Sequence, residues 1–390
     1  MRVGIVADDL TGAMDAAASF ADRGMPTRVL LKAGSAADPV EGSDASVLSI
    51  DTHTREAAPA HAASAVSAAM GRLSAAGMLL FKKIDSTLRG NVGAEIVAAL
   101  TASGRHCALI APAAPQQGRV LRDGWLFVND QRVGDRPLAD MLCSSVPGWE
   151  VRSLPAADCR QLPAAERRTL YVADAADESD LDRVAQLGLA DARHVLLAGS
   201  SGLASAVARQ VCAAGSAAAD AQPTYQRLWF VVGSYSARSA EQVRTLVAQH
   251  PVCTVVLPLS GEVRVLAPKL KAATVGLVHV EGLGQPPALE AGHVAARLAQ
   301  LTEDLLAEAP QEEIGLFMTG GDTARAILER FGAAAIDVYG SRYPGVVHGR
   351  AVVRGRAIGL MTKAGGFGTP DLFARAAADL LAKPIISVPQ

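Results

Sequence analysis

Short runs of apolar residues alternate with longer alanine-rich stretches along most of this chain, and this alternation constrains its fold more than any other feature. The first runs are VGIVA, TRVLL, VLSI, MLLF and CALIAPA. Because apolar residues occupy successive positions in these runs, both faces of each strand must be buried. Parallel sheets with helices on both faces bury strands in this way. We therefore predict an α/β fold with mostly parallel sheets flanked by helices.

The alternation stops and restarts near the middle of the chain, which predicts two domains. Residues 213–226 read AAGSAAADAQPTYQ, a small and polar stretch without apolar periodicity. This composition is typical of an exposed connection. The length of 390 residues also exceeds that of an ordinary domain, roughly 100–200 residues. We predict one α/β domain over residues 1–215, with a hairpin around GWLFVND, and a second over residues 226–390.

The charge balance argues against binding to large polyanions. The chain has 37 Lys and Arg residues against 39 Asp and Glu residues, a formal net charge of −2. Such a chain has no basic field that would hold nucleic acid or an anionic membrane surface. A small molecule is therefore the expected partner.

Cysteine usage and hydropathy predict a cytoplasmic protein. The five cysteines are scattered and never form a CxxC pair, which favours neither a disulfide framework nor a zinc site. The N-terminal apolar run is too short for a secretion signal, and no stretch approaches the roughly 20 apolar residues of a membrane span.

Polar residues that follow an apolar run are the first candidates for function, because open parallel sheets bind ligands at the carboxyl ends of their strands. Asp8 and Asp9 follow VGIVA, and adjacent carboxylates suit a metal, a cation or a substrate hydroxyl. Helix capping by Asp9 or Thr11 explains them about as well. Arg55, in DTHTR after VLSI, could bind a carboxylate bidentately, although a surface arginine is almost as plausible.

The densest polar cluster is KKIDSTLRGN, at residues 82–91, directly after MLLF. Lys83, Ser86 and Arg89 could bind a carboxylate or a phosphate through charge-assisted hydrogen bonds. Asp85 could act as a base or a metal ligand. A solvated turn is the alternative, but the strong apolar flanks favour the end of a strand.

Three glycine-bearing turns follow apolar runs in the second half of the chain. They read GSYS from Gly233, TGGDT from Thr319 and KAGGFG from Lys363. Such glycines let backbone N–H groups approach phosphate oxygens before a helix begins. Each turn alone could be a tight packing turn, but three in one domain favour a nucleotide phosphate site. Neither GxxxxGK[ST] nor a first-strand GxGxxG is present, which excludes the two commonest nucleotide-binding motifs.

Taken together, these stretches resemble the four-carbon acid sugar kinase family, whose members phosphorylate threonate, erythronate or related tetronates with ATP. The resemblance runs nearly end to end. It is carried by VADDLTGAMD, DTHTR, KKIDSTLRGNVGAE, GSSGLA, VVGSYSARSAEQV, MTGGDTARAIL, PGVVHGR and LMTKAGGFGTPDLF. It implies that the first domain binds the sugar acid, that the second binds ATP, and that the active site lies in the cleft between them.

The resemblance also implies which residues bind each substrate. The sugar acid would contact Asp9, Arg55, Lys83, Asp85, Ser86 and Arg89. The nucleotide would contact Ser234, Gly320, Gly321, Asp322, Thr323, Gly365 and Gly366. This chain departs from the commoner family pattern in having GGDT for GGET, GSYS for GSCS-like forms, and Gly366 for Asn. These departures bear on substrate detail more than on nucleotide binding.

A kinase must align the acceptor hydroxyl with the γ-phosphoryl group and neutralise the charge that moves. We expect Mg²⁺ and basic side chains to neutralise this charge, with no residue assigned to the metal. We expect Arg55 and Lys83 to anchor the substrate carboxylate. Asp85 or Asp9 would then receive the proton of the terminal hydroxyl, which gives a 4-phospho product.

D-Threonate is the favoured substrate, with 4-phospho-D-threonate as product. D-Erythronate and 3-oxo-tetronate are alternatives, as is a non-catalytic sensor of sugar acids and nucleotides on the same scaffold. A phosphatase of the haloacid dehalogenase type would need DxDxT, and neither Asp8 nor Asp9 has a carboxylate two positions later. A homodimer is the general expectation for a soluble enzyme.

Overall fold

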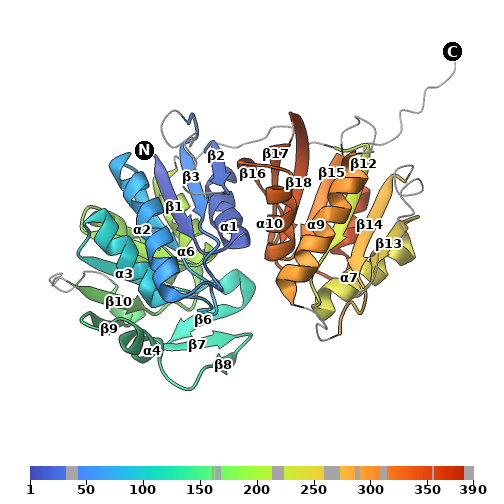
Figure 1. Ribbon diagram of the computed structural model, residues 1–390. Coiled ribbons are helices and arrows are strands. Elements are labelled where there is room, and N and C mark those ends of the chain that lie inside the picture. The colour runs from blue at the N-terminus through green and yellow to red at the C-terminus, as the bar shows by residue number, and fades with distance from the viewer. Residues whose placement is uncertain are drawn as a thin grey trace, which may run out of the picture. The chain divides into compact units, whose positions relative to one another are not determined.

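The computed structural model describes two compact units, Met1–Ala218 and Ala219–Gln390, each with its own core (Figure 1). Most of the predicted connection, residues 213–223, lies outside the described residues. Each unit contains a parallel sheet with helices packed on it, which confirms the predicted α/β class. The structure describes residues 1–31, 43–159, 162, 168–212, 224–258, 273–285, 290–307, 314–353 and 355–381.

The first unit is built on a parallel sheet with the strand order β2-β3-β1-β4-β11-β5-β10-β9. Strands β1, β3, β5, β10 and β11 are buried at every position, as their unbroken apolar runs predict. The strands are β1 (Val3–Ala7), β2 (Thr27–Leu30), β3 (Val47–Asp51), β4 (Leu79–Lys83), β5 (Cys107–Ala111), β9 (Glu150–Leu154), β10 (Thr169–Ala173) and β11 (Val195–Gly199).

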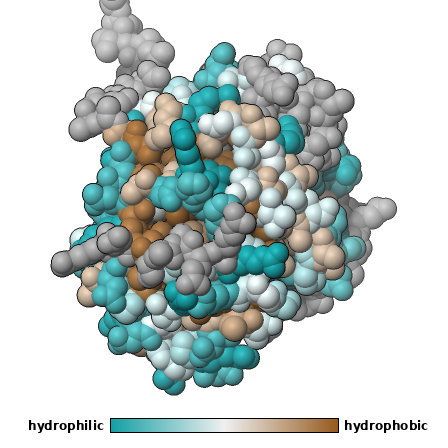
Figure 2. All heavy atoms as spheres, turned by 90° about the vertical axis from the view of Figure 1, so that its left-hand side faces the viewer, coloured by the Kyte–Doolittle hydropathy of each residue, from teal (hydrophilic) through white to brown (hydrophobic). Residues whose placement is uncertain are grey.

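Helices cover both faces of this sheet. The first face carries α1, α5 and α6 in a row, and their core includes Ile5 and Phe20. The opposite face carries α2 and α3, and a Cβ on Gly4 would lie only 3.0 Å from Leu73 of α2. Hydrophilic and hydrophobic residues are interspersed on the face drawn in Figure 2. The helices are α1 (Leu10–Ala21), α2 (Pro59–Ala75), α3 (Val92–Ser103), α5 (Glu178–Ala190) and α6 (Ser201–Val211).

A small antiparallel sheet accompanies the large one in the first unit. Strands β6 (Arg119–Arg122), β7 (Trp125–Val128) and β8 (Gln131–Val133) pair in sequence order, which confirms the hairpin predicted around GWLFVND. Helix α4 (Leu138–Ser145) follows and packs against β9. Two short 3₁₀ helices, η1 (Pro115–Gln117) and η2 (Ala156–Asp158), complete the described elements of this unit.

The chain changes direction across the large sheet at β1. Helix α1 connects β1 to β2, which lies toward one edge of the sheet. Helix α2 connects β3 to β4, which lies on the opposite side of β1, toward the other edge. Ala7 pairs with Asp51, and Val6 pairs with Lys82, so the three strands end at nearly the same level. The segments after β1, β3 and β4 are therefore neighbours at one edge of the sheet, where such folds bind ligands.

The second unit has the strand order β13-β14-β12-β15-β18-β17-β16, parallel from β13 to β18 and antiparallel from β18 to β16. Helices α7 and α11 pack together, as do α9 and α10. The strands are β12 (Arg227–Val232), β13 (Cys253–Leu257), β14 (Val275–Val280), β15 (Ile314–Thr319), β16 (Ala335–Tyr343), β17 (Val346–Val353) and β18 (Arg356–Lys363). The helices are α7 (Ala237–Gln249), α9 (Ala291–Ala307), α10 (Gly321–Arg330) and α11 (Leu372–Leu380).

The three glycine turns of the second unit follow adjacent strands. Val232 at the end of β12 pairs with Thr319 at the end of β15, and Thr319 pairs with Lys363 at the end of β18. The turns therefore leave the sheet side by side at its carboxyl edge, as the turns after β1, β3 and β4 do in the first unit.

Candidate active site

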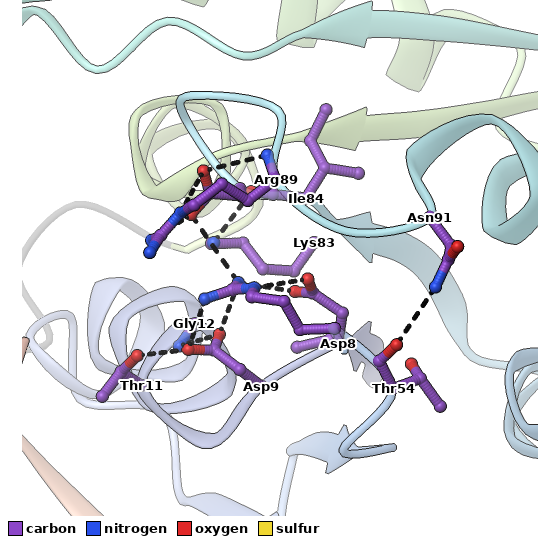
Figure 3. A network of polar contacts seen from close by, with 12 residues as sticks. Asp8, Asp9, Thr11, Gly12, Thr54, Lys83, Ile84, Arg89 and Asn91 are labelled. Carbon is purple, nitrogen blue, oxygen red and sulfur yellow. Dashed lines mark hydrogen bonds and ion pairs between the residues drawn. The ribbon is translucent and has the colours of Figure 1, made fainter. Parts of the chain in front are cut away.

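Arg55 joins the two adjacent carboxylates that follow β1. Its Nε and Nη2 donate to Asp8 at 2.8 and 2.9 Å, and its Nη1 and Nη2 donate to Asp9 at 2.7 and 2.9 Å. Asp9 also caps α1 by accepting a 2.8 Å hydrogen bond from the Gly12 N–H. Asp9 therefore both caps the helix and belongs to the charged cluster with Asp8 and Arg55. Figure 3 shows the network around Asp8 and Asp9.

This arginine is already largely occupied. Four of its five N–H bonds point to Asp8 and Asp9, and its side chain is only 13% exposed. Burial acts to raise the pKa of Asp8, but the hydrogen bond from Arg55 and the charges of Lys82 and Lys83 hold that pKa below its usual value. Asp8 is therefore ionised at neutral pH, and Arg55 holds both carboxylates in place.

Asp85, which follows β4, extends the same network. Its Oδ1 accepts hydrogen bonds from the N–H and hydroxyl of Thr87, and its Oδ2 accepts one from Arg89 Nη2 at 2.8 Å. Arg55 Nη2 lies 3.7 Å from the same Oδ2. Burial acts to raise the pKa of Asp85, but Arg89, Thr87 and Arg55 hold it well below its usual range. Asp85 is thus a carboxylate anion whose Oδ2 has acceptor capacity left.

Lys83 and Arg89 keep donors for a ligand. The Lys83 Nζ lies against α1, 3.1 Å from where a Cβ on Gly12 would be, and donates to the Ile84 carbonyl at 2.9 Å. Within the described part of the chain, Lys83 forms no ion pair. The Arg89 side chain is 65% exposed. Ser86 is half-buried, and its hydroxyl bonds to no other described residue.

A buried ion pair supports this network and was missed in the sequence. Lys82 Nζ lies 2.8 Å from Oε2 of Glu95 on α3, and both side chains are at most 2% exposed. The Thr54 hydroxyl donates to Glu95 Oε1 at 2.8 Å, and the Thr54 N–H donates to the Asp8 carbonyl at 2.9 Å. The pair therefore links β4 and α3 to the loop that carries Arg55.

Gly90 is a second residue that sequence reasoning passed over. Its φ is +85°, and a Cβ there would lie 3.0 Å from Asp8 Oδ2. Glycine is therefore required here both for the backbone conformation and for the close approach to the carboxylate. The signal in the sequence was a glycine directly after a charged cluster.

The second unit brings most of its predicted site residues together in the three glycine turns. A Cβ on Gly365 would overlap the Ser234 side chain, and a Cβ on Gly233 would overlap the Thr323 hydroxyl. The Gly320 N–H donates to the Lys363 carbonyl at 3.1 Å. The turns are therefore packed against one another with glycine at each contact.

The remaining predicted nucleotide residues lie at the open side of these turns. Gly321 and Asp322 begin α10, where the first N–H groups have no acceptor within the helix. Asp322 and Gly366 are exposed, and nothing lies within 4 Å of a Cβ on Gly366. Backbone N–H groups at such a helix start are suited to an anion.

Comparison with known proteins decides the family. A model of a sugar-binding N-terminal domain matches residues 3–146, and a model of a nucleotide-binding C-terminal domain matches residues 229–373. The chain is 36% identical to a D-threonate kinase of Bordetella bronchiseptica, over 96% of each chain. The chain belongs to the four-carbon acid sugar kinase family.

Another relative agrees with this assignment, and solved structures share the fold. A 3-oxo-tetronate kinase of Methylobacterium radiotolerans is 29% identical, covering 96% of this chain and 98% of its own. A solved structure from Salmonella typhimurium LT2 matches 98% of this chain and 100% of its own, with a TM-score of 0.80 and 25% identity. A solved structure from Haemophilus influenzae shares the fold: it is 22% identical, has a TM-score of 0.73, and matches 97% of this chain and 100% of its own.

As a four-carbon acid sugar kinase, this protein is an enzyme that uses ATP, which confirms the predicted activity class and sets aside the non-catalytic alternative. Its substrate is a small sugar acid. Among the described residues, no helix combines the length and the apolar character that a membrane crossing requires.

Proposed function

We propose that this four-carbon acid sugar kinase phosphorylates the terminal hydroxyl of D-threonate and yields 4-phospho-D-threonate. Relatives named D-threonate kinase from Bordetella bronchiseptica, Salmonella typhimurium and Cupriavidus necator are 36%, 29% and 31% identical to the chain. A D-erythronate kinase of Heliobacterium modesticaldum is 27% identical, and the 3-oxo-tetronate kinase named above is 29% identical. These two acids are the alternative substrates.

The observation that carries this proposal is that cations with unused donors lie beside the carboxylates at the ends of β1, β3 and β4. In our proposal Lys83 and Arg89 bind the substrate carboxylate, since both have N–H bonds available. Arg55 was predicted for this role. We now propose that it acts mainly by holding Asp8 and Asp9 and by its charge, because four of its N–H bonds are taken.

Asp85 is the better of the two candidates for the proton acceptor. Each oxygen of Asp9 already accepts two hydrogen bonds, whereas Asp85 Oδ2 accepts one and has Arg55 at 3.7 Å. The lowered pKa of Asp85 makes it a weak base. Phosphoryl transfer relies mainly on positioning and charge stabilisation, so a carboxylate that orients the hydroxyl and accepts its proton is sufficient.

The glycine turns of the second unit are proposed to bind ATP, with the first unit binding the sugar acid. Ser234, the turn from Gly320 to Thr323, and the pair Gly365 and Gly366 would hold the phosphates through backbone N–H and hydroxyl groups. The active site in a cleft between two domains, with a boundary near residues 215–226, stays a prediction.

Mg²⁺ fits this arrangement through the nucleotide. Among the described residues, no group of three or more His, Cys, Asp or Glu side chains could hold a metal ion. Mg²⁺ commonly binds one or two carboxylates together with substrate phosphates. Asp322, exposed at the start of α10 beside the turns, is the candidate carboxylate. Bound there, the ion would neutralise charge on the phosphates.

A panel of four-carbon sugar acids tests the proposal. ADP formation would be measured with ATP, Mg²⁺ and D-threonate, D-erythronate, 3-oxo-tetronate or L-threonate, with ATP alone as the control. We expect kcat/KM to be about tenfold or more higher for D-threonate than for its epimer, because a mispaired hydroxyl leaves buried polar groups unsatisfied. Phosphorus and carbon NMR would place the phosphate on carbon 4. Turnover with none of these acids would contradict the proposal.

A further inference from the structure

The carbonyl groups of the third glycine turn are held by buried and half-buried side chains that have had no role so far. The Gly365 carbonyl oxygen accepts hydrogen bonds from Ser236 Oγ at 2.7 Å, Ser239 Oγ at 3.0 Å and Lys363 Nζ at 3.0 Å. The Ala364 carbonyl accepts from Lys363 Nζ at 3.1 Å and from the Phe367 N–H of the turn itself at 3.1 Å. A carbonyl oxygen has two lone pairs, so the three donors around the Gly365 oxygen are more than this acceptor needs to be fully hydrogen-bonded.

These bonds determine where the neighbouring N–H groups point. In a planar trans peptide the C=O and N–H groups point in opposite directions, and the described chain contains no cis peptide. Because the Gly365 carbonyl points inward to α7 and Lys363, the N–H of Gly366 points outward. The Ala364 carbonyl likewise turns the N–H of Gly365 outward. Neither N–H has an acceptor among the described residues, and Gly366 is exposed.

Lys363 is an unusual residue for this position if folding alone is considered. It is 1% exposed, forms no ion pair within the described residues, and lies with its Nζ 5.6 Å from the ring centre of Phe373. The hydroxyl of Thr319, its neighbour in β15, is also buried and has no hydrogen-bond partner among the described residues. Burial, reinforced by the charge of Arg238, lowers the pKa of Lys363 to about 7. A buried amine without a counter-ion destabilises the fold, and an anion bound nearby would offset this.

We propose that Lys363, Ser236 and Ser239 are positioning residues for the nucleotide phosphates. They hold two successive carbonyls inward, so that the N–H groups of Gly365 and Gly366 donate to a phosphate oxygen. The positive charge of Lys363 at the carbonyl end polarises both peptides in the direction that strengthens these donors. This inference rests on the proposed placement of ATP in the second unit, and it names the residues that orient the turn for phosphate binding.

Nucleotide binding by two variants of the full chain tests the inference. Lys363→Met removes the charge and both hydrogen bonds at similar length, and Ser239→Ala removes one hydroxyl. Thr245→Ala is the matched control, because the Thr245 hydroxyl also lies on α7 but donates to the Glu241 carbonyl of its own helix at 3.0 Å. Dissociation constants for ATP, ADP and adenosine would be measured by titration calorimetry, and KM for ATP and kcat by ADP release.

We expect Lys363→Met to weaken ATP and ADP binding about tenfold or more, and Ser239→Ala to weaken it about threefold, as loss of charged and neutral hydrogen bonds predicts. Adenosine, which lacks phosphate, should bind all variants equally, and Thr245→Ala should resemble the wild type. A KM effect larger than the kcat effect is expected, because the turn binds phosphate in the ground state as well.

Several outcomes would overturn the inference. Unchanged ATP affinity in Lys363→Met is one, and a parallel loss of adenosine binding is another, since it would indicate general damage to the unit. If circular dichroism shows that Lys363→Met does not fold, Ser239→Ala decides, and wild-type ATP affinity there refutes the role. The titrations need no sugar acid. An enzyme that binds ATP in this way but phosphorylates none of the four-carbon acids would contradict the proposed substrate alone.

Discussion

At the carboxyl ends of β1, β3 and β4, the first unit gathers charged side chains that bind one another, with Arg55 as the central cation. At the corresponding ends of β12, β15 and β18, the second unit presents glycines, hydroxyls and backbone N–H groups, with Lys363 buried beneath them. The same strand-end position is thus filled by side chains in one unit and by backbone in the other. Side chains can distinguish the hydroxyl pattern of a sugar acid, whereas backbone donors suit a phosphate that every nucleotide carries.

Arg55→Met should have the largest effect, because the charged network depends on one guanidinium. Asp8, Asp9 and Asp85 would then lie together without their shared cation. We expect the variant to lose about 3–5 kcal/mol in free energy of unfolding, as is usual when a buried ion pair loses one partner. Misplaced carboxylates should also lower kcat/KM for the sugar acid by about hundredfold or more. Urea unfolding and the ADP-release assay measure the two effects.

Arg122→Met provides the control for that experiment. Arg122 forms an ion pair with Asp130 at 2.7 Å, but the two side chains are 46% and 89% exposed. Exposed pairs of this kind contribute about 0–1 kcal/mol. If both variants lost the same free energy of unfolding, the buried Arg55 network with its two carboxylates would be no stronger than an ordinary exposed ion pair.

A pair of glycine substitutions tests whether the second unit binds through its backbone. Gly365→Ala would place a methyl group on the Ser234 side chain, whereas Gly366→Ala has nothing within 4 Å. We expect Gly365→Ala to raise KM for ATP about tenfold or more, because the turn must move and its N–H groups move with it. Gly366→Ala should change KM for ATP less than threefold, since its N–H remains. A reversed order would contradict the packing of these turns.

The most gradual expected effect, spread over several pH units, is a pH dependence of stability that arises from Lys363. Its pKa is about 7 in the folded chain and 10.5 in an unfolded one, so between these values the unfolded chain carries a proton that the folded chain lacks. The free energy of unfolding should therefore rise with pH in this window, by up to about 1.4 kcal/mol per pH unit from this group. Urea unfolding at pH 7.5, 8.5 and 9.5 measures the slope.

Lys363→Met is the reference for that slope, because it removes the titrating group and leaves the others unchanged. The wild type should show the steeper rise without nucleotide. With saturating ATP its slope should flatten, because a bound anion favours the protonated lysine. Identical slopes in wild type and variant, with and without ATP, would mean that Lys363 does not titrate in this range.

Much of this architecture follows from the sequence, because burial on both faces leaves a direct mark in the residues. VGIVA and CALIA became strands with every residue buried. The strand-end rule then located the charged cluster. Parallel strands end at the same edge of a sheet, so Asp9, Arg55 and Asp85 meet although they lie far apart in the chain.

The features that escaped prediction depend on contacts that local sequence does not encode. Glu95 meets Lys82 only because α3 packs back against the strand that precedes it, β4. Arg55 binds Asp8 as well as Asp9 because the strand order places the end of β3 beside the end of β1. The antiparallel strands β16, β17 and β18 did have a signal. The connections between these strands are too short for the crossover that parallel strands need, which indicates antiparallel pairing. Gly345, in the connection from β16 to β17, has a φ of +73°, as tight hairpin turns require.

The inward carbonyl of Gly365 has a consequence for protein engineering. Every residue except proline carries the N–H that this peptide turns outward, so non-proline substitutions at Gly366 would leave the proposed phosphate contact in place. The proposed sugar-acid site is different, because recognition there would rest on individual side chains such as Ser86, which is half-buried and whose hydroxyl bonds to no other described residue. A designer could therefore retarget this kinase to another acid by changing a few side chains of the first unit, while the phosphoryl donor site is left as it stands.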